Sequence, residues 1–303
     1  MRYPFMSAVN EYLAVYKGIY SEGMLSELNR RYPKISRQIR SLYESGRISS
    51  TNPSKMTPED VREYAKYLRA RGLKPSSVGH DISSLSMLCK YCGNNCVDTA
   101  RSKYPLLFPK RTHDRLPVTE RPEFDYIVKV AGGLKASDDY LRIRAYAAVL
   151  FAFGTGSRTL ELQHAKLHNL SPDLKTFLFT HVKGKDTYGR PRPVPIRKEV
   201  RPILSLYLTV RPEGSDYLFP SPEGRYLSGN ILQRSRRLVC EETGVEFDYR
   251  KCRRTYAQYL VDAGFPIDHV AVILGHSNTK TTENSYARPR PDRVVSEILE
   301  VWG

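Results

Sequence analysis

The chain has 303 residues, enough for two domains with cores of their own. Lysine and arginine number 48 against 32 acidic residues, and the formal net charge of +16 favours a nucleic-acid partner, although a basic membrane-surface or ribosome-associated protein would carry a similar charge. A hydrophobic content of 40% argues against wholesale disorder, and no apolar run reaches the roughly 18 residues of a transmembrane helix. We therefore expect an intracellular, cytoplasmic protein without a membrane partner.

The first hundred residues are predicted to be helical. Thr57 is a suitable N-cap, Pro58 suits the first helical position, and apolar residues follow at helical spacing. A second helix is predicted from Pro75, with an apolar stripe at Val78, Ile82, Leu85 and Leu88. Before residue 50, the breakers at Tyr32-Pro33 and 49–53 predict short helices.

Three cysteines gather at the end of that second helix. Cys89, Cys92 and Cys96, with His80 upstream, would make a zinc site in one interpretation. In the other, Cys89 faces a core and the glycine and asparagines at 93–95 end the helix. Because a second CxxC pair is missing, we expect no metal and no cofactor.

Residues 107–117 are predicted to link two domains, at 1–106 and 118–303. Prolines disfavour regular structure over residues 101–117, and Lys103, Lys110, Arg111 and Arg115 suit contacts to DNA phosphates, unless this is a solvated basic loop. Beyond the linker, helices are joined by one β-hairpin, with strands at 177–182 and 192–196. The predicted fold class is mainly α with a small β-hairpin.

Four blocks of the second domain carry groups suited to a phosphate. Arg158, in FGTGSRTLEL, is expected in the first turn of a helix, where a guanidinium can hold two phosphate oxygens and Glu161 can support it. Lys183, in HVKGKD, follows the first strand. A lysine whose pKa is lowered by neighbouring cations can act as a general acid. Lys183 is the first candidate for this role, and Lys185 is the alternative.

The third block, DYRKCRRTYA, places Arg250 and Arg253 one helical turn apart, so both can face one phosphate, unless the block is simply a basic DNA-facing patch. The fourth, LGHSNTKTTENSYAR, holds His276 and, ten residues later, Tyr286. A free tyrosine has a pKa near 10, so it is a weak nucleophile outside a cationic site.

The order of these blocks and the residues within them resemble the catalytic domain of tyrosine recombinases, the phage-integrase family. The resemblance is strong over residues 145–290 and weaker over 56–92, which resemble the family's helical core-binding domain. It implies the catalytic set Arg158, Lys183, Arg250, Arg253, His276 and Tyr286. Where the family usually has a histidine this chain has Arg250, which cannot accept a proton, and the RKCRR block resembles archaeal-type integrases.

The resemblance further implies a site-specific recombinase, the integrase of a virus, plasmid or other mobile element. It would cut double-stranded DNA through a 3′-phosphotyrosyl intermediate without metal or ATP. Dimers or tetramers on DNA are expected, with the amphipathic segment 293–302 docking on its own domain or on a neighbour. The alternatives are a type IB topoisomerase-like relaxing enzyme and a catalytically inactive architectural DNA-binding protein.

Overall fold

The computed structural model describes residues 4–108, 117–182 and 189–276, together with residues 282–283, 295 and 299–300. The chain divides into two compact units, Met1–Thr112 and His113–Gly303, and the division falls inside the segment predicted to be a linker. Each unit has a hydrophobic core of its own. Within the part of the chain described, no helix is long and apolar enough to cross a membrane.

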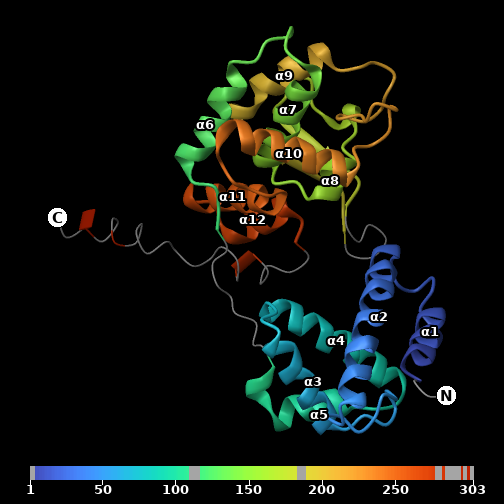
Figure 1. Cartoon of the computed structure of the whole chain (residues 1–303). Coiled ribbons are helices and arrows are strands. Elements are labelled where there is room, and N and C mark those ends of the chain that lie inside the picture. The colour runs from blue at the N-terminus through green and yellow to red at the C-terminus, as the bar shows by residue number, and fades with distance from the viewer. Residues whose placement is uncertain are drawn as a thin grey trace. The chain divides into compact units, whose positions relative to one another are not determined.

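The N-terminal unit is helical, as predicted (Figure 1). The helix predicted from Thr57 begins there, because the Thr57 side chain accepts from the Asp60 N–H and the Asp60 carboxylate accepts from the Thr57 N–H. The apolar stripe predicted for the next helix is buried. The helices of this unit are α1 (Phe5–Val15), α2 (Glu22–Glu44), α3 (Pro58–Ala70), α4 (Pro75–Tyr91), α5 (Cys96–Lys103) and the 3-10 turn η1 (Pro105–Leu107).

Two predicted breaks in this unit are wrong. Pro33 lies inside the single helix α2, on its exposed side. An interior proline costs roughly 3 kcal/mol, and each fully buried large apolar side chain contributes about 1.5–3 kcal/mol. The buried stripe of α2 is large enough to offset the proline; it comprises Leu28, Tyr32, Ile35, Ile39 and Leu42. Similarly, α5 and η1 extend to Leu107, so the prolines of 101–117 do not exclude regular structure before that point.

The cysteine cluster lies where α4 meets α5. Cys89 and Cys96 are buried and free, and the hydrogen bond that the Cys89 thiol donates to Cys96, together with burial, raises the pKa of Cys89. Cys92 caps the end of α4 and is half-buried, whereas His80 is exposed. Among the described residues, no group of three or more histidine, cysteine or acidic side chains is arranged to hold a metal ion. The metal content of the protein stays a prediction.

The C-terminal unit is built around α7 (Tyr140–Thr155). Every residue from 143 to 155 is buried, since α6, α9, α10 and α11 all pack against this helix (Figure 1). The other helices are α6 (Arg121–Gly132), α8 (Thr159–Gln163), α9 (Arg201–Val210), α10 (Gly229–Thr243), α11 (Tyr249–Asp262) and α12 (Ile267–Leu274), with 3-10 turns η2 (Leu167–Asn169) and η3 (Lys198–Val200).

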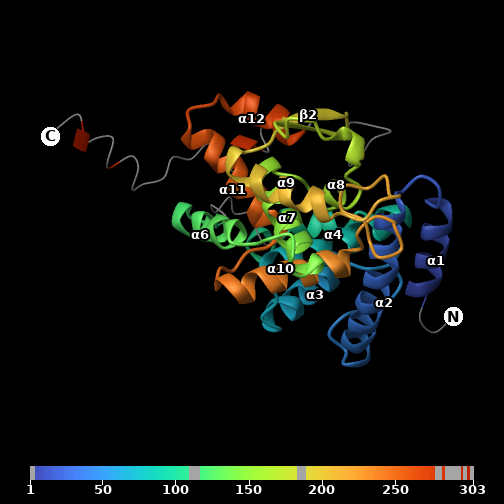
Figure 2. The same cartoon turned by 90° about the horizontal axis from the view of Figure 1, so that it is seen from above.

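The predicted hairpin is confirmed as an antiparallel pair, β1 (Thr176–Phe179) and β2 (Arg192–Pro195). Thr176 pairs with Pro195 and Phe179 with Arg192. One face of the hairpin is buried against the core, and β2 lies beside α12 (Figure 2). The hairpin therefore places β2 next to α12, and His276 lies just after the end of that helix.

Candidate active site

The turn between α7 and α8 fixes the first arginine. Gly156 ends α7 in the left-handed conformation, with φ +63°, and a Cβ there would lie 2.6 Å from Cδ1 of Tyr256. Arg158 is the N-cap of α8 and is not in its first turn, one position earlier than predicted. Its backbone N–H donates to Oε2 of Glu161, so a protein carboxylate and not a bound anion occupies this N–H.

Glu161 is the centre of the site, with only 1% of its surface exposed. Its Oε1 accepts from Nη1 of Arg158 at 2.9 Å, which confirms the predicted support of that guanidinium. Nη1 and Nη2 of Arg192 donate to Oε1 and Oε2, both at 2.9 Å, and Nη1 of Arg253 lies 4.0 Å from Oε2. Burial raises the pKa of Glu161, but the hydrogen bonds and charges of Arg192 and Arg158 outweigh it and hold that pKa below its ordinary value.

Arg192 was not predicted to belong to the site. It starts β2, and its Nε donates to the carbonyl of Ile273 at 2.8 Å while its other nitrogens hold Glu161. The side chain thereby ties the hairpin to the end of α12. One signal in the sequence does mark it. Alternation along the strand puts Arg192 on the same buried face as Val194, where an arginine needs a charged partner.

Arg253 projects from α11 and is 9% exposed. Its Nη1 donates to the carbonyl of Gly156 at 2.8 Å, and its Nη2 donates to the carbonyl of Leu274 at 2.6 Å. Arg158 donates from Nη2 to the neighbouring carbonyl of Gly275 at 2.8 Å. The last carbonyls of a helix carry partial negative charge and lack partners within the helix, so with Arg192 on Ile273 the end of α12 holds three guanidinium groups.

His276 directly follows that helix end. Its Nε2 lies 3.1 Å from Nη2 of Arg253, and its Nδ1 lies 2.7 Å from Oγ1 of Thr282. Because a guanidinium only donates, we assign the lone pair to Nε2 and the proton to Nδ1, which donates to Thr282. Burial lowers the pKa of His276 to about 4, with further lowering by the charges of Arg253 and Arg158. The imidazole is therefore neutral at pH 7.

The remaining predicted residues are placed differently or lie outside the description. Arg250 is exposed near the start of α11, and no hydrogen bond or ion pair joins it to another described residue. It does not contact Glu161, although it lies one turn before Arg253. Lys183, its alternative Lys185 and Tyr286 lie outside the described residues.

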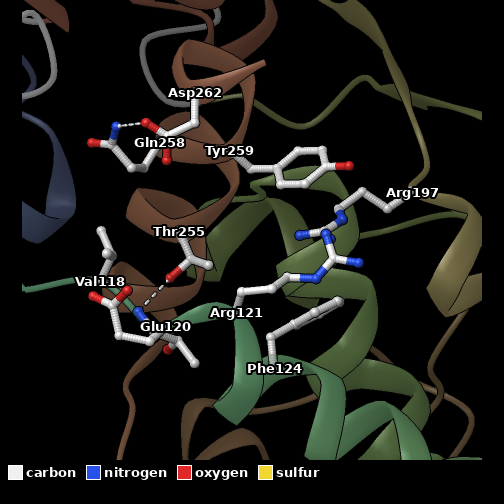
Figure 3. A pocket seen from close by; sticks show the side chains of 10 residues that line it. Val118, Glu120, Arg121, Phe124, Arg197, Thr255, Gln258, Tyr259 and Asp262 are labelled. Carbon is white, nitrogen blue, oxygen red and sulfur yellow. Dashed lines mark hydrogen bonds between the residues drawn. The ribbon is translucent and has the colours of Figure 1, made fainter. Parts of the chain in front are cut away.

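The helix that carries Arg253 is also held from a second side. Thr119 N–H donates to Oγ1 of Thr255 at 2.9 Å, which anchors the chain just after the predicted linker on α11 (Figure 3). Beside this bond lies a pocket of about 110 Å³. At its edge the guanidinium of Arg197 lies 4.1 Å from the ring centroid of Phe124 and 3.9 Å from that of Tyr259 (Figure 3). These cation–π contacts join α6, α11 and the segment after β2.

Comparison with known proteins agrees with the motifs. The sequence profile of the phage integrase family matches residues 129–293. The tyrosine recombinase XerC of Leptospira interrogans is 30% identical over 237 residues, which are 75% of this chain and 72% of the relative. The tyrosine recombinase XerA of Pyrococcus furiosus is 26% identical over 232 residues, 75% of each chain.

Solved structures share the fold. The XerH site-specific recombinase bound to its palindromic difH substrate aligns over 100% of this chain and 97% of its own, with a TM-score of 0.72 and 14% identity. The Tn1549 transposon integrase in complex with transposon right end DNA aligns over 98% and 99%, with a TM-score of 0.68 and 18% identity. With the profile match over more than half its length, the chain belongs to the phage integrase family of tyrosine recombinases.

Proposed function

We propose that this protein is a site-specific DNA recombinase that cuts and rejoins double-stranded DNA through a 3′-phosphotyrosyl intermediate. The observation that carries the proposal is the convergence of Arg158, Arg253 and neutral His276 around the buried carboxylate of Glu161. These groups come from three separate sequence blocks, and the fold fixes them before any DNA arrives. Preorganised donors of this kind stabilise the charge that develops on a phosphodiester in the transition state.

In this proposal Tyr286 attacks the phosphorus in line. A bond forms between its phenolic oxygen and phosphorus, and the bond from phosphorus to the 5′-oxygen breaks. Lys183, or Lys185 in its place, donates a proton to the leaving 5′-oxygen. The 5′-hydroxyl of another strand then attacks the phosphotyrosine and releases the enzyme. The energy of the broken bond is kept in the intermediate, so the joining step needs no ATP.

Arg250 and His276 take complementary roles in the proposed reaction. The exposed guanidinium of Arg250 stays charged and can donate to the phosphate, but it cannot take the proton of the tyrosine. In the neutral imidazole of His276 the Nε2 lone pair can accept a proton, and once Nε2 carries that proton it can donate a hydrogen bond to the scissile phosphate. We assign the phosphate contact to His276 and leave the proton of Tyr286 to this imidazole or to water.

We further propose that the enzyme acts inside the cell and assembles into dimers or tetramers on DNA. An apolar pocket of about 350 Å³ on the α11–α12 side of the C-terminal unit is a candidate docking site for the amphipathic segment 293–302. Phe265 and Val272 at this pocket are 53% and 68% exposed and belong to one contiguous, mainly apolar lining, and apolar patches of this kind mark contact surfaces. The segment can come from the same chain or from a neighbour.

A suicide substrate tests the proposed function. The cognate site is first sought in the DNA flanking the gene and is then built with a nick that lets the cleaved end diffuse away. In EDTA and without nucleotide, the wild-type protein should form a covalent adduct on denaturing gels. The Tyr286→Phe variant should bind the same DNA and form no adduct. If the wild-type protein binds the site but gives no adduct, the proposal is wrong and an architectural role takes its place.

A further inference from the structure

A pocket of about 300 Å³ lies between α2 and the end of α3 in the N-terminal unit. Its lining consists of Lys34, Arg37, Gln38, Ser41, Tyr67 and Arg71, and no carboxylate is among these side chains. Each of them offers at least one N–H or O–H donor. A ligand that fits this lining accepts hydrogen bonds and carries negative charge.

Two of the three cations are available for such a ligand. Lys34 is partly compensated, since its Nζ donates to Asp81 at 2.8 Å. Arg37 and Arg71 are exposed, and within the described residues neither forms an ion pair with a carboxylate. To the described residues, Arg37 makes one long bond of 3.4 Å, from Nε to the carbonyl of Pro33. Arg71 donates from Nη1 to the hydroxyl of Tyr67 at 3.3 Å, which holds its guanidinium at the pocket.

The buried wall of the pocket holds a donor that has no acceptor. Gln38 is 5% exposed, and its Oε1 accepts from the hydroxyl of Tyr64 at 2.9 Å. With Oε1 placed toward Tyr64, Nε2 of Gln38 is buried without a hydrogen-bond partner among the described atoms. Buried N–H groups of this kind are rarely left unsatisfied in native proteins. Because Nε2 is itself buried, a ligand acceptor reaches it only if the Gln38 side chain turns toward the pocket.

We infer that this pocket binds one phosphate group of the DNA backbone. Phosphate oxygens accept from several donors at once, and they favour the guanidinium pairs that Arg37 and Arg71 provide. Tyr67 is the one aromatic side chain among the described residues of the lining, and Cζ of Arg71 lies 5.6 Å from the centroid of its ring. Since the lining offers no second ring for a base, it fits a backbone phosphate better than a free nucleotide. The choice of DNA as the source of the phosphate rests on the proposed function.

The spacing of the residues gives the pocket a role in positioning. Lys34, Arg37 and Ser41 recur on one face of α2, and Tyr67 and Arg71 lie one turn apart at the end of α3. Two helices that are fixed by a common core thus hold a single phosphate. Contacts to phosphates set the register of a protein on the duplex without reading its sequence. The pocket should therefore contribute equally at cognate and unrelated sites.

Neutral phosphates provide the test. Methylphosphonates are placed one at a time along the cognate duplex, and the affinity of the full-length protein is measured for each. A methylphosphonate at one position should weaken DNA binding by the wild-type protein. The same methylphosphonate should not further weaken DNA binding by the double variant Arg37→Gln/Arg71→Gln. The matched variant Arg30→Gln changes an exposed arginine on the same helix outside the pocket, and that position should still matter in it. The slope of log K against log salt should fall by about 0.9 for the lost phosphate in the double variant.

A second variant guards against an effect on folding. Ser41 is exposed, so Ser41→Glu places a negative charge in the pocket without touching the core. It should weaken DNA binding and abolish the effect of the same methylphosphonate, whereas Ser26→Glu, at an exposed position of α2 outside the pocket, should leave that effect intact. The inference would be overturned if, at every position, the methylphosphonate weakened binding by the pocket variants as much as it weakens binding by the wild-type protein. It would also be overturned by pocket variants that lose inorganic phosphate binding in calorimetry while they bind DNA like wild type.

The two proposals fail in different ways. If the wild-type protein forms a covalent adduct on the suicide substrate but no methylphosphonate loses its effect in the pocket variants, only the pocket inference fails. If the wild-type protein binds DNA through the pocket and forms no adduct, the proposed recombinase chemistry fails and the pocket remains.

Discussion

Replacing Glu161 by glutamine tests how the active site is held together. The substitution keeps the size of the side chain and removes its charge. Arg192, which is buried, loses a bidentate carboxylate partner. Arg158 loses the acceptor of either its backbone N–H or its Nη1, because the amide keeps only one oxygen. One atom of the new amide would also bring N–H donors toward guanidinium donors. Gly275 would still accept from Arg158.

The expected cost follows from the burial of the ion pair. Removing one partner of a buried ion pair destabilises a protein by about 3–5 kcal/mol, because the other charge is left uncompensated. Glu161 is 1% exposed and Arg192 7% exposed, so this range applies to the pair. The low pKa of Glu161 means that its stabilisation is complete above the ordinary pKa of 4.5 and is lost as the pH falls through the lowered value in the folded protein. The difference between the two proteins should therefore shrink below pH 4.5.

Urea titration followed by hydrogen-exchange mass spectrometry measures this cost, since peptides from α7 and α8 report the C-terminal unit separately. Peptides from α2 and α4 serve as an internal control and should not change. Asp125→Asn is the matched variant: it removes the carboxylate of an exposed pair with Arg121 and should cost no more than about 0.5 kcal/mol. A loss below about 1 kcal/mol for Glu161→Gln at pH 7 would refute the view that this carboxylate organises the site.

Four further outcomes are expected. His276 should titrate by NMR near pH 4 in the DNA-free protein, and a midpoint above pH 6 would show that it is not held neutral by burial and the arginines. Arg250→Ala should fold normally and lose most cleavage, whereas Arg250→Lys should keep part of it; an alanine variant that cleaves like wild type would place residue 250 outside the site. Elemental analysis should find no stoichiometric zinc, and one zinc per chain that disappears in Cys92→Ser would contradict this. DNA affinity should fall linearly in log K against log salt, and a flat response would argue against phosphate contacts as its main source.

Local signals in the sequence predicted local structure well. The start of α3 at Thr57-Pro58 depends on hydrogen bonds within four residues, and the structure has both bonds of that capping box. The hairpin strands were predicted from alternation and a loop of suitable length, and they pair in antiparallel register. Pro33 shows the limit of such signals. The free-energy cost of a proline inside a helix can be outweighed by the burial of the helix's apolar side chains. The extent of that burial is a property of the folded unit and cannot be read from the local sequence.

The active site was only partly predictable for the same physical reason. Three site residues belong to recognisable sequence motifs: Arg158, Arg253 and His276. The structure brings all three together around Glu161 and the end of α12. Arg192 has no motif, and its role depends on partners 31 and 81 residues away. Its position on the buried face of a strand was the one available sign. A buried charge in an alternating strand predicts that a partner exists but does not identify it.

The identity of the nucleophile tests the central claim most directly. The adduct formed on a suicide substrate, labelled at the 3′-phosphate of the cut, is digested with protease and nuclease, and the modified peptide is sequenced by mass spectrometry. The chain has 21 tyrosines, so the result discriminates among many candidates. We predict a nucleotide joined through its 3′-phosphate to Tyr286. A nucleotide on any other residue, or one joined through a 5′-phosphate, would contradict the account.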